Sequence, residues 1–220
     1  MKIHFQRELD ALKKMMLSLG ARVEKAVRLA IKALETRDIA LAKNVIDADH
    51  EIDENEVEVE EECLKILALY QPVAIDLRII CAMIKINNDL ERVGDEAVNI
   101  AERVITMAKQ PAMEIPFDYN LMAEKAESML KSSLDALVNL DQDLAHKVCL
   151  ADDEVDDMNR KMYDKVKDGI LNEPERVGYL INLLLVSRHL ERIADHATNI
   201  AEEVIYMIEG IIHRHVKDEI

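Results

Sequence analysis

Apolar side chains recur at three- and four-residue intervals along almost the whole chain. Between residues 4 and 35 they include Leu9, Leu12, Met16 and Leu19. This spacing places them on one face of an α-helix, whereas a half-buried strand needs an apolar residue at every second position. With only 5 glycines and 4 prolines in 220 residues, the chain also has few turn formers. The pattern therefore predicts an all-α fold of long helices.

Interruptions of this pattern divide the chain into six predicted helices. The prolines fall at residues 72, 111, 116 and 174, and two further breaks at residues 36–38 and 139–141 carry polar residues that can cap a helix. Short connections make successive helices antiparallel. The predicted helices cover residues 4–35, 38–70, 73–109, 118–138, 141–171 and 175–213.

The third and sixth predicted helices contain a duplicated motif. Residues 90–105 read LERVGDEAVNIAERVI and residues 190–205 read LERIADHATNIAEEVI, identical at 11 of 16 positions. A second match pairs residues 48–53 with 151–156, at a spacing of 103 instead of 100 residues. The sequence therefore predicts two tandem three-helix bundles, residues 1–110 and 118–220, with a connection at 111–117. They could pack side by side or end to end.

Composition limits the compartments and partners that suit this chain. Its 28 Lys and Arg against 44 Asp and Glu give a net charge of −16, which repels nucleic-acid phosphates and anionic lipid surfaces. No apolar stretch approaches the length of a membrane span, and the first residues lack the apolar block of a signal peptide. The three cysteines lack metal-site spacing and are expected to be buried small side chains in a reducing compartment. We expect a cytoplasmic protein without nucleic-acid partners or membrane insertion.

An acidic strip runs along the third helix of each repeat. Its four members fall within roughly 80° of one another, and the apolar face is centred roughly 140° away. Carboxylates one turn apart repel each other, so the strip does not stabilise the helix, but its oxygens suit Mg, Mn, Ca or iron ions. The candidate metal ligands are Glu91, Asp95, Asn99 and Glu102 in the first repeat, and Glu191, Asp195, Asn199 and Glu202 in the second.

A solvated acidic face with local salt bridges is the alternative interpretation, and the recurrence of the strip in both repeats favours metal binding. Acidic pairs on the second helices, Asp49 with Asp53 and Asp152 with Asp156, could complete each site or simply be caps and solvated side chains. Gly94 suggests a close approach by another helix or by a metal cluster, and plain packing explains the small residue equally well. His196, at the position equivalent to Glu96, is expected on the surface.

Motifs typical of enzymes are missing from the sequence. No Glu-x-x-His occurs, which argues against a di-iron oxidase or iron store of the ferritin type. Phosphate-binding glycine loops, HExxH and GxSxG are also absent, and no cysteine has a repeated histidine partner. The protein is therefore expected to have no catalytic residues.

The tandem repeats, each ending in LER-(I/V)-(G/A)-D-x-x-x-N-I-A-E, resemble the PhoU family of phosphate-transport regulators. The segment QPVAIDLR, from Gln71 to Arg78, is similar to the opening of that family's third helix, whereas the second repeat departs there with NEPERVGYL. The resemblance extends over essentially the whole chain.

This resemblance implies a non-catalytic cytoplasmic regulator. It would act with the phosphate ABC transporter and a membrane sensor histidine kinase, and would keep the phosphate-starvation response off when phosphate is plentiful. It also implies divalent or trivalent metal ions or iron clusters on Glu-x-x-x-Asp motifs, here Glu91 with Asp95 and Glu191 with Asp195. Association into a homodimer is expected as well. The competing class is a helical scaffold or adaptor that grips partners through apolar grooves without any metal.

Overall fold

The computed structural model describes residues 2–111 and 119–211, and within these ranges it is all-α, as the sequence predicts. Each predicted helix is present with ends within a few residues of the expected ones. The helices are α1 (Lys2–Thr36), α2 (Ile39–Tyr70), α3 (Ile75–Ala108), α4 (Tyr119–Asn139), α5 (Gln142–Asn172) and α6 (Val177–Glu209), with a 3₁₀ turn η1 (Pro174–Arg176) before α6.

Several helix ends have the local chemistry that the sequence predicts. The Asp38 carboxylate accepts hydrogen bonds from the first backbone N–H groups of α2, and Asp141 does the same for Leu144 at the start of α5. The end of α6 differs from the expected residue 213, because Gly210 adopts φ 79° and ends the helix as a left-handed cap. Residues 212 and 213, and nearly all of the predicted connection at 111–117, lie outside the described residues.

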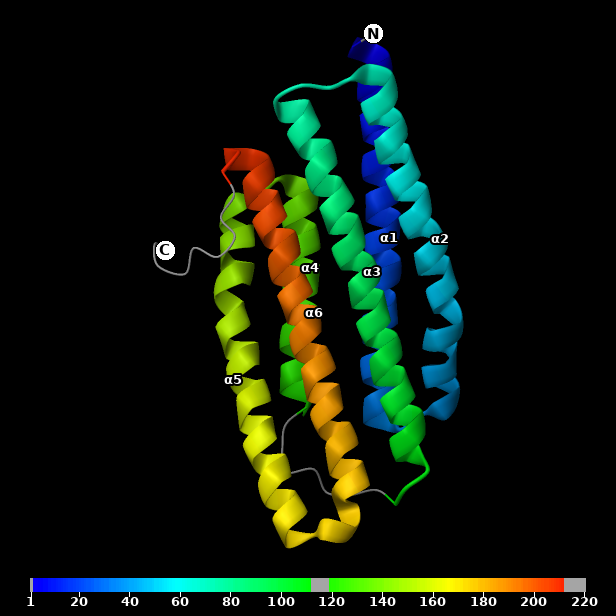
Figure 1. Ribbon diagram of the computed structural model, residues 1–220, viewed down its shortest axis with the longest axis vertical. Helices are drawn as coiled ribbons and strands as arrows, with labels where there is room; N and C mark the ends of the chain where they lie inside the picture. Colours follow the sequence, from blue (N-terminus) through cyan, green and yellow to red (C-terminus); the bar gives the residue numbers. More distant parts are fainter. Residues whose placement is uncertain (1, 112–118, 212–220) are drawn as a thin grey trace.

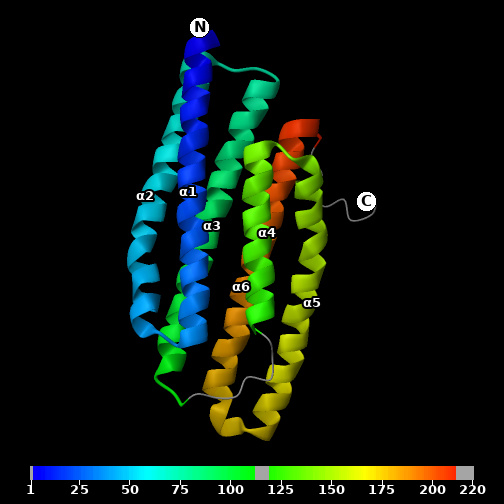
Figure 2. The ribbon, with the colours of Figure 1, turned by 180° about the vertical axis from the view of Figure 1, so that it is seen from behind.

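The two three-helix bundles pack side by side, which answers the question that the sequence left open. Helices α3 and α6 run antiparallel through the middle of the molecule, with α1 and α2 beside α3 and with α4 and α5 beside α6 (Figure 1). From behind, α1 and α4 lie in front of this central pair (Figure 2). The apolar faces of all six helices form one continuous core. Within the described residues, no helix is both long enough and apolar enough to cross a membrane.

Two histidine–carboxylate pairs join the bundles across α3 and α6. His189 Nδ1 lies 2.6 Å from Glu96 Oε2, and His196 Nδ1 lies 2.9 Å from Asp89 Oδ1. Carboxylates only accept hydrogen bonds, so each imidazole donates. The expectation of a surface position for His196 was wrong, because its side chain is only 15% exposed at this interface. Since Asp89 and His189 are repeat equivalents, as are Glu96 and His196, the two pairs are related by the approximate two-fold symmetry of the repeats.

Gly20 of α1 marks a close crossing with α4. A Cβ at this position would lie 3.0 Å from Leu134 Cδ2, tighter than normal contact. We expect Gly20→Val to lower the free energy of unfolding by about 1–3 kcal/mol, because a branched side chain would overpack the contact. Gly178→Val is the matched control, since a Cβ there meets nothing within 4 Å. Urea unfolding of both variants measures the difference, and equal losses would show that the crossing is not tight.

Candidate metal centre

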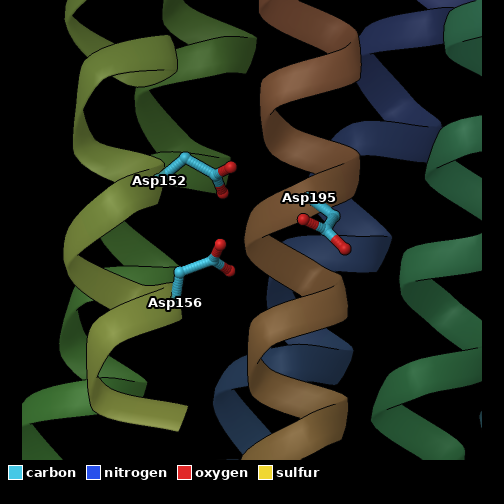
Figure 3. A group of neighbouring side chains, drawn as sticks. All are labelled: Asp152, Asp156 and Asp195. Atoms are coloured by element: carbon cyan, nitrogen blue, oxygen red, sulfur yellow. The ribbon is translucent and has the colours of Figure 1, made fainter. Parts of the chain in front are cut away.

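Three aspartates meet between α5 and α6 in the second repeat. Asp152 and Asp156 project from α5 toward α6, where Asp195 lies opposite them (Figure 3). One carboxylate oxygen from each lies within 4.8 Å of the others. Among the described residues, this is the one group of three or more His, Cys, Asp or Glu side chains that comes this close. Its members include one predicted strip residue, Asp195, and the aspartate pair of the second helix that was considered as its complement.

The local helix geometry explains why these side chains converge. Asp152 and Asp156 are four residues apart and therefore lie on the same face of α5, one turn from each other. Val155, beside them, is fully buried and anchors that side of α5 in the core. On α6, Asp195 follows Ala194, which is fully buried in the core. Core packing thus holds the three carboxylates toward one another despite their charges.

The electrostatics of this cluster favour a bound cation or proton. Burial, followed by the charges of Asp195 and Asp156, raises the pKa of Asp152 to about 6. Burial and then the neighbouring Glu191 and Asp156 raise the pKa of Asp195 to about 6 as well. Asp152 Oδ1 and the Thr198 hydroxyl are buried, and hydrogen bonding from Thr198 opposes the rise in the pKa of Asp152 without cancelling it. A metal ion among the three carboxylates would compensate for their burial and for their mutual repulsion.

The equivalent carboxylates of the first repeat also lie near one another. Burial, followed by Asp53 and Asp95, raises the pKa of Asp49 to about 6. The pKa values of Glu91 and Asp95 are raised too, in each case by burial and then by a neighbouring carboxylate. A Cβ on Gly94 would lie 3.4 Å from Asp49 Oδ1, so the glycine lets α2 and its aspartate lie close against α3. The close approach predicted at Gly94 is confirmed.

The four members of each acidic strip lie in two different environments. The Glu-x-x-x-Asp part faces the aspartates of the preceding helix, as the electrostatic neighbours of Glu91, Asp95, Glu191 and Asp195 show. The remaining members point elsewhere. The Asn199 amide donates to Asp89 across the bundle interface, and the Asn99 amide donates to Glu96. Glu102 is exposed beside Arg103, and Glu202 lies near Cys149, where its charge contributes to a raised thiol pKa.

These clusters suit hard cations bound through oxygen. The donor set of the second-repeat cluster is three carboxylates without nitrogen or sulfur, as preferred by Mg, Ca, Mn or iron rather than by zinc or copper. The cysteines are not part of it. All three are free, and burial raises the pKa of the Cys63 thiol to about 12, so this thiol stays protonated at neutral pH.

The fold and its acidic residues define the class of this protein: a duplicated helical protein with neighbouring carboxylates between the second and third helices of each half, which come closest together in the second half. Comparison with known proteins then names the family. The PhoU domain family model matches residues 16–104 and again residues 119–204. The chain belongs to the PhoU family.

Relatives and solved structures agree with this assignment over nearly the full length. A phosphate-specific transport system accessory protein PhoU homolog of Aquifex aeolicus is 40% identical, covering 97% of each chain. The crystal structure of PhoU from Pseudomonas aeruginosa superposes with a TM-score of 0.90 at 37% identity, covering 94% of this chain and 100% of that one. The phosphate transport system regulatory protein PhoU from Streptococcus pneumoniae gives 0.87 at 29% identity, covering 94% and 98%.

Proposed function

We propose that this protein is a cytoplasmic, non-catalytic accessory of a phosphate ABC transporter that helps to keep the phosphate-starvation response off when phosphate is plentiful. Its partners would be the cytoplasmic components of the transporter and a sensor histidine kinase, and it would act as a homodimer. The observation that carries the proposal is the full-length match of both repeats to the PhoU family, whose relatives are named as accessory proteins of phosphate-specific transport.

We further propose that the carboxylate clusters hold metal ions or small metal clusters that prepare the surface for its partners. The convergence of Asp152, Asp156 and Asp195 between α5 and α6 supports this. Glu191 is the added ligand in the second repeat, and Glu91 and Asp95 with Asp49 and Asp53 form the counterpart in the first. Burial and then mutual repulsion raise the pKa values of Asp152 and Asp195, and a bound cation would offset both effects.

The metal content of the purified protein tests the second proposal. After dialysis against excess Mn²⁺ or Fe²⁺ and removal of free ions, we expect Asp152→Asn/Asp195→Asn to retain less metal than the wild type. The matched control is Asp164→Asn/Asp168→Asn, which removes the same charge from exposed positions of α5 and should bind as much metal as the wild type. Equal metal content in all three proteins would contradict a site at this cluster.

A reporter of phosphate-starvation genes tests the regulatory role. In a bacterial strain that lacks its own PhoU protein, the wild type should silence the reporter in phosphate-rich medium, and the Asp152→Asn/Asp195→Asn variant should do so only weakly. Silencing that persists in the variant would favour the metal-independent scaffold, whereas a wild type that never silences the reporter would contradict the regulatory role.

A further inference from the structure

The repeats carry two equivalent surface grooves whose linings differ in charge. In the first repeat a groove of about 690 Å³ between α2, α3 and α6 is lined by Glu56, Glu60, Asn88 and Asp89 among others. In the second, a groove of about 750 Å³ between α5 and α6 is lined by Asn159, Tyr163 and Arg188, the repeat equivalents of Glu56, Glu60 and Asn88. Both repeats therefore have the groove, but its acidic positions at Glu56 and Glu60 are uncharged in the second repeat, where Arg188 stands in place of Asn88.

The second groove, here called the arginine groove, is defined by Arg160, Arg188, Arg192, Tyr163, Leu184 and Leu185. Arg192 pairs with the buried Glu96 of α3 at 3.0 Å, whereas core packing does not explain Arg160 and Arg188. Arg160 pairs with Asp157 on the same helix, an exposed contact of little energetic value. Arg188 is exposed, and its charge opposes the rise in the pKa of Glu191. Three guanidinium groups thus gather on the surface of a chain whose net charge is −16.

We propose that the arginine groove binds a short acidic segment of a partner protein. Its lining on α6 runs from Leu184 to Asp195, which at 1.5 Å per residue is roughly 16 Å, the length of about five residues of extended chain. Arginine forks bind carboxylates through paired hydrogen bonds. An exposed tyrosine beside arginines is also the composition typical of the residues that dominate protein interfaces.

The ends of the groove indicate how such a segment lies. Leu184 and Leu185 are half-buried at one end and offer an apolar contact, whereas Glu191 and Asp195 lie toward the other end and repel acidic residues. The acidic side chains therefore bind near Arg160 and Arg188, with an apolar side chain toward the leucines. A small oxyanion fits less well, because in an open groove it reaches one solvated arginine, whereas an extended segment reaches both Arg160 and Arg188 and also contacts the leucines.

Nuclear magnetic resonance titration of the ¹⁵N-labelled full chain tests the proposal. The probe is the blocked peptide Glu-Leu-Glu-Glu-Leu-Glu at up to millimolar concentration. We expect amide shifts at the arginine groove and none at the acidic groove of the first repeat. Arg160→Glu/Arg188→Glu should weaken binding roughly tenfold or more. The control Lys161→Glu/Lys167→Glu reverses the same charge on exposed α5 residues outside the groove and should bind like the wild type.

Other outcomes overturn the proposal. Absence of shifts at millimolar peptide, or equal binding by both variants, would exclude an acidic-segment site in this groove. Shifts produced there by inorganic phosphate but not by the peptide would assign it to a small oxyanion instead. The inference deepens the proposed function by giving the chemistry of one partner, and rests on it in that respect. Failure of this inference is distinguishable from failure of the proposed function, because peptide binding is measured without added metal and without the phosphate-starvation reporter.

Discussion

Replacing Glu96 by alanine is expected to lower the free energy of unfolding by about 3 kcal/mol, because it breaks a buried charged network and leaves its donors without an acceptor. The Glu96 side chain is only 3% exposed, and it accepts from His189 at 2.6 Å while pairing with Arg192 at 3.0 Å. Burial alone would raise the pKa of Glu96, but these partners hold it below its usual value. The carboxylate is therefore charged at neutral pH.

Urea unfolding of Glu96→Ala and Glu54→Ala measures this effect against a matched control. Glu54 is exposed and pairs with His50 one turn away, so its removal should change stability by no more than about 0.5 kcal/mol. A double-mutant cycle with His189→Ala should give a coupling energy of about 1–3 kcal/mol. A loss at Glu96 as small as that at Glu54 would show that the network does not hold the bundles together.

Much of the fold follows from the sequence because its signals are local. The positions of Pro72 and Pro174 and the capping side chains of Asp38 and Asp141 mark helix ends without reference to the rest of the chain. The order and antiparallel course of the helices then follow from the short turns. The early end of α6 was missed although its signal, Gly210, stands in the sequence, because the apolar pattern continues beyond it.

The packing of the bundles depends on contacts between distant segments, which the periodicity does not encode. The duplicated motif even obscured this packing, because Glu96 and His196 look like an unimportant difference between the two copies when these are aligned. Their roles become clear only when α3 lies antiparallel to α6, because His189 and His196 of the second repeat then each face an acid of the first. The same applies to Asn199, which helical phase placed with the metal ligands and which donates to Asp89 instead.

The candidate metal centre was predicted in part. The Glu-x-x-x-Asp motif marked Asp195 correctly as a member of an acidic cluster, because the repeat pattern identified it. Asp152 and Asp156 could not be distinguished from capping or solvated side chains, since their proximity to α6 depends on how α5 is rotated in the bundle. The signal that favoured them was their own recurrence, with Asp49 and Asp53 at the equivalent positions.

The metal-free protein is expected to gain stability as the pH falls from 7 to 5, and the metal-loaded protein to lose it. Asp49, Asp152 and Asp195 have pKa values of about 6 in the folded state, above the usual 3.8. An acid whose pKa is raised on folding binds protons more tightly in the native state, so its contribution is fully present below about 3.8 and is lost as the pH rises through 6. Because these side chains are partly solvated, we expect about 1 kcal/mol from each.

Metal reverses this dependence because protons and cations compete for the same oxygens. At 100 times its dissociation constant, an ion stabilises the protein by about 2.7 kcal/mol at pH 7, and this gain shrinks as the aspartates are protonated. Thermal unfolding with chelator and with Mn²⁺ at pH 5, 6 and 7 measures both trends. In Asp152→Asn/Asp195→Asn, the metal-free protein should be more stable than the wild type at pH 7, and Mn²⁺ should add less stability.

The difference between the wild type and this variant isolates the cluster, since all other ionisable side chains are common to both. If the variant is less stable than the metal-free wild type at pH 7, then the three aspartates do not repel one another and no cation is needed between them. Parallel pH profiles with chelator and with Mn²⁺ would likewise contradict binding at these oxygens. Stability that changes with pH in opposite directions with chelator and with Mn²⁺ in the wild type, but similarly in the variant, would show that these carboxylates bind the cation.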